Sequence, residues 1–322
     1  LRYLVEAAQH SYAIDVPSGV DSDAGIALSP VPRFTHCIAL GAWKPAHLLM
    51  PARTIAAQHV LADIGIAAPI CCAQSLAAPR LEAPAPDAHK YRRGLVAVVA
   101  GSMPGASALS AQAAAHSGAG YVRLLADSPP LDHVHAIVRS RSLDFSRARA
   151  ALIRPGLGRD AIARARLLAT LKAGLPAVLD ADALWHLAET GLTNLPTTVI
   201  ATPHEGEFDN LFGDEEGNKI DTTCAAAART GIVIIHKGPD TIISAPDGRC
   251  AVAPPASSWL STAGTGDVLA GLCAGRLAVT GDPFRAACEP VWLHGEAARR
   301  AGAAFVADDL VPHIPAALAS AL

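Results

Sequence analysis

The chain has 322 residues, of which 51% are hydrophobic and 4% aromatic, and its formal net charge is −3. This length suits one large α/β domain with a smaller piece attached. A charge so close to zero provides no broad field for nucleic acid or an anionic membrane, so we expect neither as a partner and expect any anionic ligand to be held by a local site.

The seven cysteines form no Cys-X-X-Cys pair, which argues against structural zinc and against a disulfide framework. No apolar run approaches the roughly 20 residues of a membrane helix, and no charged-then-apolar leader opens the chain. We therefore expect a cytoplasmic protein. Because the only methionines are Met50 and Met103, we also expect a truncated N-terminus.

A change in composition predicts the domain boundaries. Residues 67–88 are rich in Ala and Pro and have no sustained periodicity, which is typical of a linker. We therefore expect a partial α/β piece over residues 1–66 and a larger domain over residues 89–322.

Apolar runs in the larger domain alternate with Ala-rich helical stretches. The runs that predict strands lie at residues 95–101, 121–125, 151–153, 176–180, 197–201 and 232–236. Several are apolar without alternation, as in strands buried on both faces of a parallel sheet. Residues 241–252 predict a hairpin with its turn at Asp247-Gly248, and the last sixty residues look helical. This order predicts a three-layer α/β/α domain with a mostly parallel central sheet and ligands at the carboxyl ends of strands.

The segment STAGTGDVLAGLCAG, residues 261–275, combines a glycine turn with an acid. Gly264 and Gly266 permit a sharp turn and close approach of the backbone to a ligand, and a helix starting near Asp267 directs unpaired N–H groups at the loop, which makes an anion site. A carboxylate there suits the activation of a hydroxyl that attacks phosphate. The alternative is that Asp267 only caps the helix.

A lysine follows the last strand of the parallel set. Lys237 and Gly238 stand between residues 232–236 and the hairpin, where a lysine can reach a nucleotide phosphate or can simply be a solvated loop residue. The loop and small-residue helix over residues 101–120 match neither GxGxxG nor GxxxxGK[ST], and tight helix packing alone can explain their alanines.

Other polar residues follow the predicted strands. His204 in TPHEGEFDNL either caps a helix or contacts a ligand, and Asp180 and Asp182 in DADAL offer caps or contacts to a polar substrate or a metal-bound water. His133 and His135 have no further ligands at helical or hairpin spacing. We therefore predict no protein metal site built from histidine or cysteine.

The order of these motifs resembles the C-terminal domain of the bifunctional NAD(P)H-hydrate repair enzymes, the ADP- or ATP-dependent NAD(P)H-hydrate dehydratases. The segments that carry the resemblance, which covers residues 89–322, are HKYRRGLVAVVAGSMPGASALSAQAAAHSGAGYVRL, RPGLG, VLDADAL, TPHEGEF, HKGPDTII, AGTGDVLAG and LHGEAA. The resemblance implies a ribokinase-like fold. It also implies conversion of the S-epimer of hydrated NADH or NADPH to the intact cofactor, driven by cleavage of ADP or ATP with Mg²⁺ assisting.

The resemblance also assigns individual residues. The hydrated nicotinamide nucleotide is assigned to Ala106, Gly158, His204 and Asp267. The ADP side is assigned to Lys237, Gly238, Pro239, Asp240, Thr241, Gly264, Thr265 and Gly266. Asp267 is the catalytic residue, which would deprotonate the C6 hydroxyl so that it accepts a phosphoryl group and then leaves as phosphate. Trp185 stands where the family often has Asn, and an acidic, shortened segment at 213–222 departs from the pattern of the lid over the nucleotide.

Residues 1–66 resemble the tail of the NAD(P)H-hydrate epimerase domain that often precedes the dehydratase. Asp15 matches the substrate-contacting aspartate of that family, and Ser18 matches a residue near its monovalent-cation site. The family's upstream glycine loop has no counterpart, so we expect no epimerase activity here. The resemblance implies a homo-oligomer.

Two other functions stay open on the sequence alone. One is a kinase for a vitamin precursor with the same fold and the same GTGD chemistry, and the other is a non-enzymatic nucleotide-binding module. The TPHEGE segment favours the dehydratase over the kinases, and intact Asp267 and Lys237 argue against the inert module.

Overall fold

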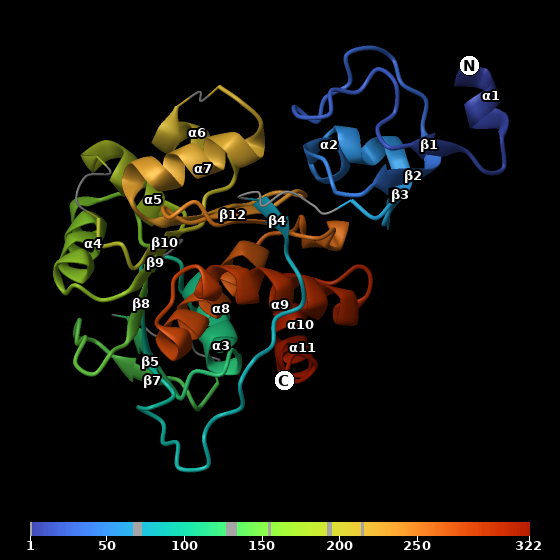
Figure 1. Cartoon of the computed structure of the whole chain (residues 1–322). Helices are drawn as coiled ribbons and strands as arrows, with labels where there is room; N and C mark the ends of the chain where they lie inside the picture. Colours follow the sequence, from blue (N-terminus) through green and yellow to red (C-terminus); the bar gives the residue numbers. More distant parts are fainter. Residues whose placement is uncertain (1, 67–72, 127–133, 154–155, 192–194, 214–215) are drawn as a thin grey trace. The chain divides into compact units, whose positions relative to one another are not determined.

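The chain divides into two compact units, which are described separately. Unit 1 comprises residues 1–74 and 215–222, and unit 2 comprises residues 75–214 and 223–322. The computed structural model describes residues 2–66, 73–126, 134–153, 156–191, 195–213 and 216–322 (Figure 1). Most of the sequence that we expected to link two domains falls at the start of unit 2.

Unit 1 is built on a small parallel sheet. Its strands, in the order β1-β2-β3, are β1 (Tyr12–Ile14), β2 (Phe34–Leu40) and β3 (Ala56–Ala62). The helical segments are α1 (Arg2–Ala7), α2 (Pro45–Leu48) and the 3₁₀ helix η1 (Ala52–Ile55). The buried apolar cluster of this sheet is small and centres on Ala13, Cys37 and Ala56.

A ten-stranded sheet runs in the order β4-β13-β12-β11-β10-β9-β8-β5-β6-β7. Its strands are β4 (Ala73–Ser75), β5 (Leu95–Val99), β6 (Tyr121–Leu125), β7 (Val138–Ser140), β8 (Ala150–Ile153), β9 (Ala177–Leu179), β10 (Val199–Ala201), β11 (Val233–His236), β12 (Ile242–Ser244) and β13 (Cys250–Val252). Strands β5 to β11 are parallel, whereas β12 is antiparallel to β11 and to β13. The sheet is therefore mostly parallel, as predicted.

Helices cover both faces of this sheet, with α3 and α8 on one side and α4 and α5 on the other (Figure 1). The helical segments of the larger unit are α3 (Pro104–His116), α4 (Ala161–Lys172), α5 (Asp182–Thr190), α6 (Glu205–Phe212), α7 (Lys219–Thr230), η2 (Ser258–Leu260), α8 (Thr265–Thr280), α9 (Arg285–Ala301), α10 (Ala307–Leu310), η3 (Val311–His313) and α11 (Ile314–Ala319). The first residues of α7 belong to unit 1. These layers confirm the predicted three-layer α/β/α architecture.

The strands of the parallel set coincide with the predicted apolar runs because every residue of β5, β8, β9, β10 and β11 is buried. The hairpin prediction is also confirmed, since β12 and β13 flank a turn in which Gly248 has φ of 90°. The sequence did not predict β4 or β7, each three residues long and with no fully buried residue.

Helices α3 and α8 pack unusually closely, which explains the glycines and serines of their sequences. A Cβ atom added at Gly271 would lie 2.3 Å from the carbonyl oxygen of Ser110, and one added at Gly275 would lie 1.7 Å from Ser117 Oγ. Within the described residues, no helix is long and apolar enough to cross a membrane.

Candidate active site

Three polar side chains meet where β9, β10 and β11 end. Asp180 follows β9, Thr202 follows β10 and Lys237 follows β11. Asp180 Oδ1 accepts hydrogen bonds from Thr202 Oγ1 at 2.8 Å and from Lys237 Nζ at 2.7 Å. Neighbouring parallel strands end at the same edge of a sheet, so residues far apart in sequence form one cluster.

Lys237 is the positive centre of this cluster. Its side chain is 19% exposed, and its Nζ lies 3.9 Å from Glu207 Oε2 in addition to the bond with Asp180. Burial opposes the charge, but the carboxylates of Asp180, Glu207 and Asp267 outweigh this effect and raise the pKa of Lys237. Lys237 is therefore a charged, partly buried ammonium, and the alternative of a solvated loop lysine is wrong.

The glycine turn directs the start of α8 toward this lysine. Gly264 is the N-cap of α8 with φ of 92°, and a Cβ added at Gly266 would lie 3.7 Å from Lys237 Nζ. The helix starts at Thr265, two residues before the predicted start, so Asp267 occupies its third position and is not its N-cap. The first N–H groups of a helix have no partner within the helix and suit a phosphate.

Asp267 is partly exposed within the first turn of α8. Its backbone carbonyl accepts a hydrogen bond from Ser110 Oγ on α3, which fixes this turn against the neighbouring helix. The influence of Asp267 on the pKa of Lys237 places its carboxylate in the same electrostatic cluster. This position is compatible with a base that acts on a hydroxyl beside a bound phosphate.

His204 does cap a helix, which was one of the two interpretations of the sequence. It is the N-cap of α6, and its Nδ1 accepts a hydrogen bond from the backbone N–H of Glu207 at 3.3 Å, while Glu207 Oε2 accepts from the N–H of His204 at 2.9 Å. This capping box also places Glu207 beside Lys237. The His204 ring also lies beside Glu207, with Nε2 3.5 Å from Glu207 Oε1, and 61% of the His204 side chain is exposed.

The residues after Lys237 form a compact turn. Thr241 Oγ1 donates to the carbonyl of Gly238 at 2.8 Å and accepts from its N–H at 3.1 Å. Asp240 is buried, with 4% exposure. The segment that the resemblance assigns to ADP is therefore a defined turn between β11 and β12.

The segments assigned to the second substrate meet where the strand order reverses. β5 lies between β6 and β8, so the loops after β5 and β8 flank a switch point, the usual ligand position in such sheets. Ala106 lies in the first turn of α3 after β5, and Gly158 follows β8 with φ of 92°. The loops touch, because a Cβ on Gly101 would lie 1.8 Å from the carbonyl oxygen of Gly156.

Asp182, the second acid of DADAL, bonds to this region. Its Oδ2 accepts from the N–H groups of Gly156 at 3.0 Å and Gly158 at 3.2 Å. His186, four residues further on, places its Nε2 3.0 Å from the carbonyl oxygen of Gly158. No sequence motif indicated His186, although its i, i+4 spacing from Asp182 is the signal of a shared helix face.

The residues assigned to the epimerase remnant lie in unit 1. Asp15 has φ of 61°, and its carboxylate accepts hydrogen bonds from the backbone N–H of Leu40 and from Lys44 Nζ. Burial would raise the pKa of Asp15, but these bonds outweigh it and lower that pKa. Ser18 is exposed. His133, which we expected not to bind metal, lies outside the described residues.

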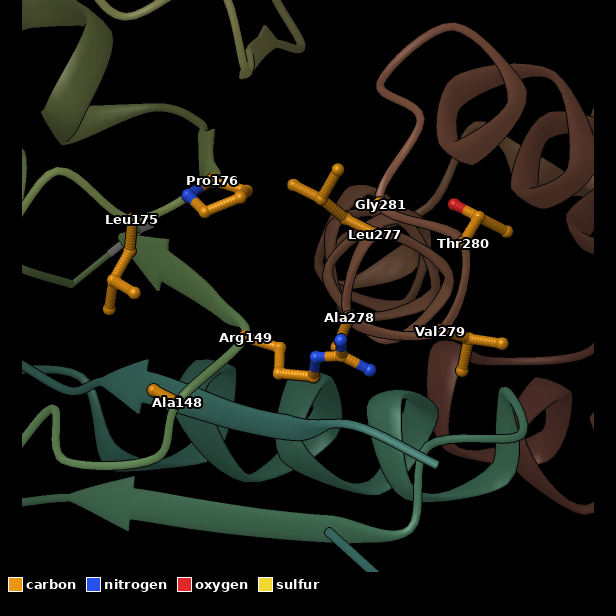
Figure 2. A pocket seen from close by; sticks show the side chains of 9 residues that line it. All are labelled: Ala148, Arg149, Leu175, Pro176, Leu277, Ala278, Val279, Thr280 and Gly281. Carbon is orange, nitrogen blue, oxygen red and sulfur yellow. The ribbon is translucent and has the colours of Figure 1, made fainter. Parts of the chain in front are cut away.

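A pocket of about 330 Å³ lies at the opposite edge of the sheet (Figure 2). It is lined by the residues that precede β8 and β9 and by the end of α8, namely Ala148, Arg149, Leu175, Pro176 and residues 277–281. Arg149 points toward Ala278 at the end of α8, where a cation interacts favourably with the helix dipole. This pocket contains none of the predicted site residues.

Comparison with known proteins identifies the family. A family model described as NAD(P)H-hydrate dehydratase matches residues 96–318. The chain belongs to the NAD(P)H-hydrate dehydratase family. It is 33% identical to the bifunctional NAD(P)H-hydrate repair enzyme Nnr of Mycobacterium leprae, in an alignment covering 96% of this chain and 68% of that protein. It is 35% identical to the Nnr of Salinibacter ruber, over 94% of this chain and 65% of the relative.

Solved structures agree with this family. The Bacillus subtilis ADP/ATP-dependent NAD(P)H-hydrate dehydratase, co-crystallised with ATP and Mg²⁺, superposes with a TM-score of 0.65 at 26% identity and covers 76% of this chain and 95% of its own. A ribokinase-like superfamily protein of Enterococcus faecalis superposes with a TM-score of 0.67 at 23% identity, covering 74% of this chain and 91% of its own, which supports the fold. The chain spans about two thirds of the length of the bifunctional relatives.

Proposed function

We propose that this dehydratase converts the S-epimer of NAD(P)H hydrate to NAD(P)H and cleaves ADP, or ATP in its place, to drive the reaction. The observation that carries the proposal is the cluster at the carboxyl edge of the sheet, where Lys237 and its carboxylates meet the glycine turn at the start of α8. A phosphate beside Lys237 and that turn would lie next to Asp267. A base and a phosphoryl donor would therefore share one site.

In the proposed reaction, Asp267 takes the proton of the C6 hydroxyl, and the hydroxyl oxygen attacks the terminal phosphorus of the nucleotide. The bond from that phosphorus to the bridging oxygen breaks, so AMP is the leaving group when ADP is the donor. The N–H groups of Gly264–Gly266 and the Lys237 ammonium stabilise charge on the transferring group. The C6–O bond then breaks and phosphate leaves, because phosphate is a better leaving group than hydroxide. Loss of a proton from C5 forms the C5–C6 double bond and restores the nicotinamide ring.

The negative charge of the cluster favours binding of a divalent cation together with the nucleotide. Asp180, Glu207 and Asp267 carry three carboxylates around the single Lys237 ammonium, so a nucleotide phosphate would meet net negative charge. Mg²⁺ usually binds one or two carboxylates together with substrate phosphates. Glu207 is the residue that would hold it, together with the substrate phosphates, and its charge would neutralise those phosphates while Asp267 stays available as the base.

The substrate side is proposed to comprise Ala106, Gly158, His204 and Asp267. The nucleotide side is proposed to comprise Lys237, Gly238, Pro239, Asp240, Thr241, Gly264, Thr265 and Gly266. Family membership and the placement of these residues along one edge of the sheet support the assignment. We also propose that the enzyme acts in the cytoplasm as a homo-oligomer and that residues 1–66 belong to an epimerase-like domain.

The experiment is to incubate the protein with NADHX, Mg²⁺ and either ADP or ATP and to follow absorbance at the wavelength of reduced nicotinamide. We expect absorbance to recover only with nucleotide present, with AMP and phosphate released when ADP is used. A stable phosphorylated product with no recovered NADH would instead indicate a small-molecule kinase. Nucleotide binding without turnover would indicate a non-enzymatic module.

A further inference from the structure

The backbone N–H and C=O groups of the turn Gly156–Gly158 need hydrogen-bond partners from other parts of the chain. Gly156 and Gly158 have φ of 80° and 92°, so neither residue continues a strand or a helix. Buried or partly buried backbone N–H and C=O groups need partners, and in this turn most of those partners are side chains.

Helix α5 supplies three of these bonds with two side chains. Asp182 Oδ2 accepts from both N–H groups of the turn, and His186 Nε2 donates to the carbonyl oxygen of Gly158 at 3.0 Å. His186 is 3% exposed, so water competes little for this bond. The two side chains lie one helical turn apart and therefore face the same segment.

The other side of the turn is bonded to the loop before α3. The carbonyl oxygen of Gly156 accepts from the N–H of Met103 at 3.3 Å and from Ser102 Oγ at 3.3 Å. The turn is thus held between α5 and the segment that leads to Ala106. Any change in the bonds from α5 would shift Gly158 relative to Ala106.

The backbone between the two acids of DADAL explains how they serve different parts of the site. Ala181 has φ of 48°, a conformation that is strained for a residue with a side chain. Asp180 on one side of it bonds to Lys237, and Asp182 on the other side bonds to the turn. The strained backbone of Ala181 therefore lies between two carboxylates that point to different places. Asp180 points toward the nucleotide side, and Asp182 points toward the substrate side.

We propose that Asp182 and His186 are positioning residues, which determine the affinity for the hydrated nicotinamide nucleotide by fixing the Gly156–Gly158 turn. This inference rests on the proposed function, since it uses the assignment of Gly158 to that substrate. Neither side chain needs to touch the reacting atoms. Their role is specific to one substrate, because the bonds of Lys237 and of the 238–241 turn do not involve them.

The kinetic test compares Asp182→Ala and His186→Leu with the conservative variants Asp182→Asn and His186→Gln. Asparagine keeps an acceptor oxygen, and glutamine places an N–H donor near the position of Nε2. We expect Asp182→Ala to raise KM for NADHX about tenfold while KM for ADP changes less than twofold. The conservative variants should show a smaller rise, and Glu189→Ala, which removes an exposed acid from the same helix, should match the parent.

A second measurement does not depend on activity. Hydrogen exchange of the amides of Gly156 and Gly158 should accelerate at least tenfold in Asp182→Ala, whereas exchange in β9 and β10 should not change. Unchanged exchange at these amides, or an equal rise in KM for NADHX and for ADP, would overturn the proposal. A parent protein that fails to repair NADHX would overturn the proposed function instead, and the exchange rates would still decide whether α5 holds the turn.

Discussion

At the scale of single residues, Lys237 has two roles that mutation can separate. It neutralises Asp180, which is 1% exposed, and it is proposed to bind the nucleotide phosphate. Lys237→Ala leaves Asp180 charged and without its cation, so we expect the free energy of unfolding to fall by about 3 kcal/mol. ADP affinity should also fall, by a factor that corresponds to about 1.5–3 kcal/mol.

A double variant tests this separation. Lys237→Met combined with Asp180→Asn removes both charges, so thermal stability should recover while ADP affinity measured by calorimetry stays weak. Recovery of ADP binding in the double variant would show that Lys237 affects the nucleotide only through the fold.

Asp267 provides the second prediction at this scale. Asp267→Asn keeps the size of the side chain but removes its capacity to take a proton, so NADHX repair should slow by roughly 10² to 10⁴-fold. Because Gly264 and not Asp267 is the N-cap of α8, a thermal melt of the variant should stay close to that of the parent. Turnover near the parental rate would exclude Asp267 as the base.

The sequence located the acids and the lysine but not their partners. Asp180 and Asp182 were recognisable as a pair at a strand end, whereas their opposite directions depend on the backbone of Ala181, which no local pattern predicts. Likewise, the bond of His186 to Gly158 joins residues 28 positions apart in sequence. Such pairs become visible only once strand order is known.

At the scale of elements, the close packing of α3 on α8 sets the position of Asp267. Gly271→Ala would place a Cβ 2.3 Å from the carbonyl oxygen of Ser110, an overlap with backbone that side-chain rotation cannot relieve. We expect a loss of about 2 kcal/mol, equivalent to a fall in Tm of roughly 4–8 °C. NADHX repair should weaken as well, since the displaced helix carries Asp267.

Gly295→Ala in α9 is the matched control for this prediction. The nearest atom to its added Cβ would be Ala256 Cβ at 3.6 Å, an ordinary contact, and alanine is the better helix former. Its Tm should equal or exceed that of the parent. An equal loss of Tm in both variants would mean that glycine content, and not the helix contact, determines the effect.

Strands could be predicted from the sequence where all of their residues are buried. Continuous apolar runs located β5, β8, β9, β10 and β11 because strands buried on both faces have no polar alternation. The helix predicted to start near Asp267 begins at Thr265, and its N-cap Gly264 has a positive φ that the sequence pattern does not define. The short edge strand β7, with the sequence VRS, has too few apolar residues to predict.

At the scale of the whole molecule, the alternation of strand-like and helical segments along the sequence was enough to predict the three layers. The helical pattern near the C-terminus likewise predicted the helices that end the chain.

The C-terminal helices also carry a group that links stability to pH. His294 on α9 is 9% exposed, and its Nε2 is buried with no hydrogen-bond partner among the described residues. Burial lowers its pKa from the ordinary 6.5 to about 4.

This depressed pKa predicts acid destabilisation. The folded protein keeps His294 neutral, whereas the unfolded chain binds a proton below pH 6.5, so the stabilisation is complete above that pH and is lost as pH falls toward 4. Between pH 7 and pH 5 the loss from this group should be about 2 kcal/mol. We expect His294→Gln, which cannot titrate, to lose less stability than the parent over this interval. The measurement is chemical denaturation of both proteins at pH 7, 6 and 5, and the difference between their slopes isolates His294 from the other histidines. Parallel slopes would show that the imidazole is already protonated, or solvated, in the folded protein.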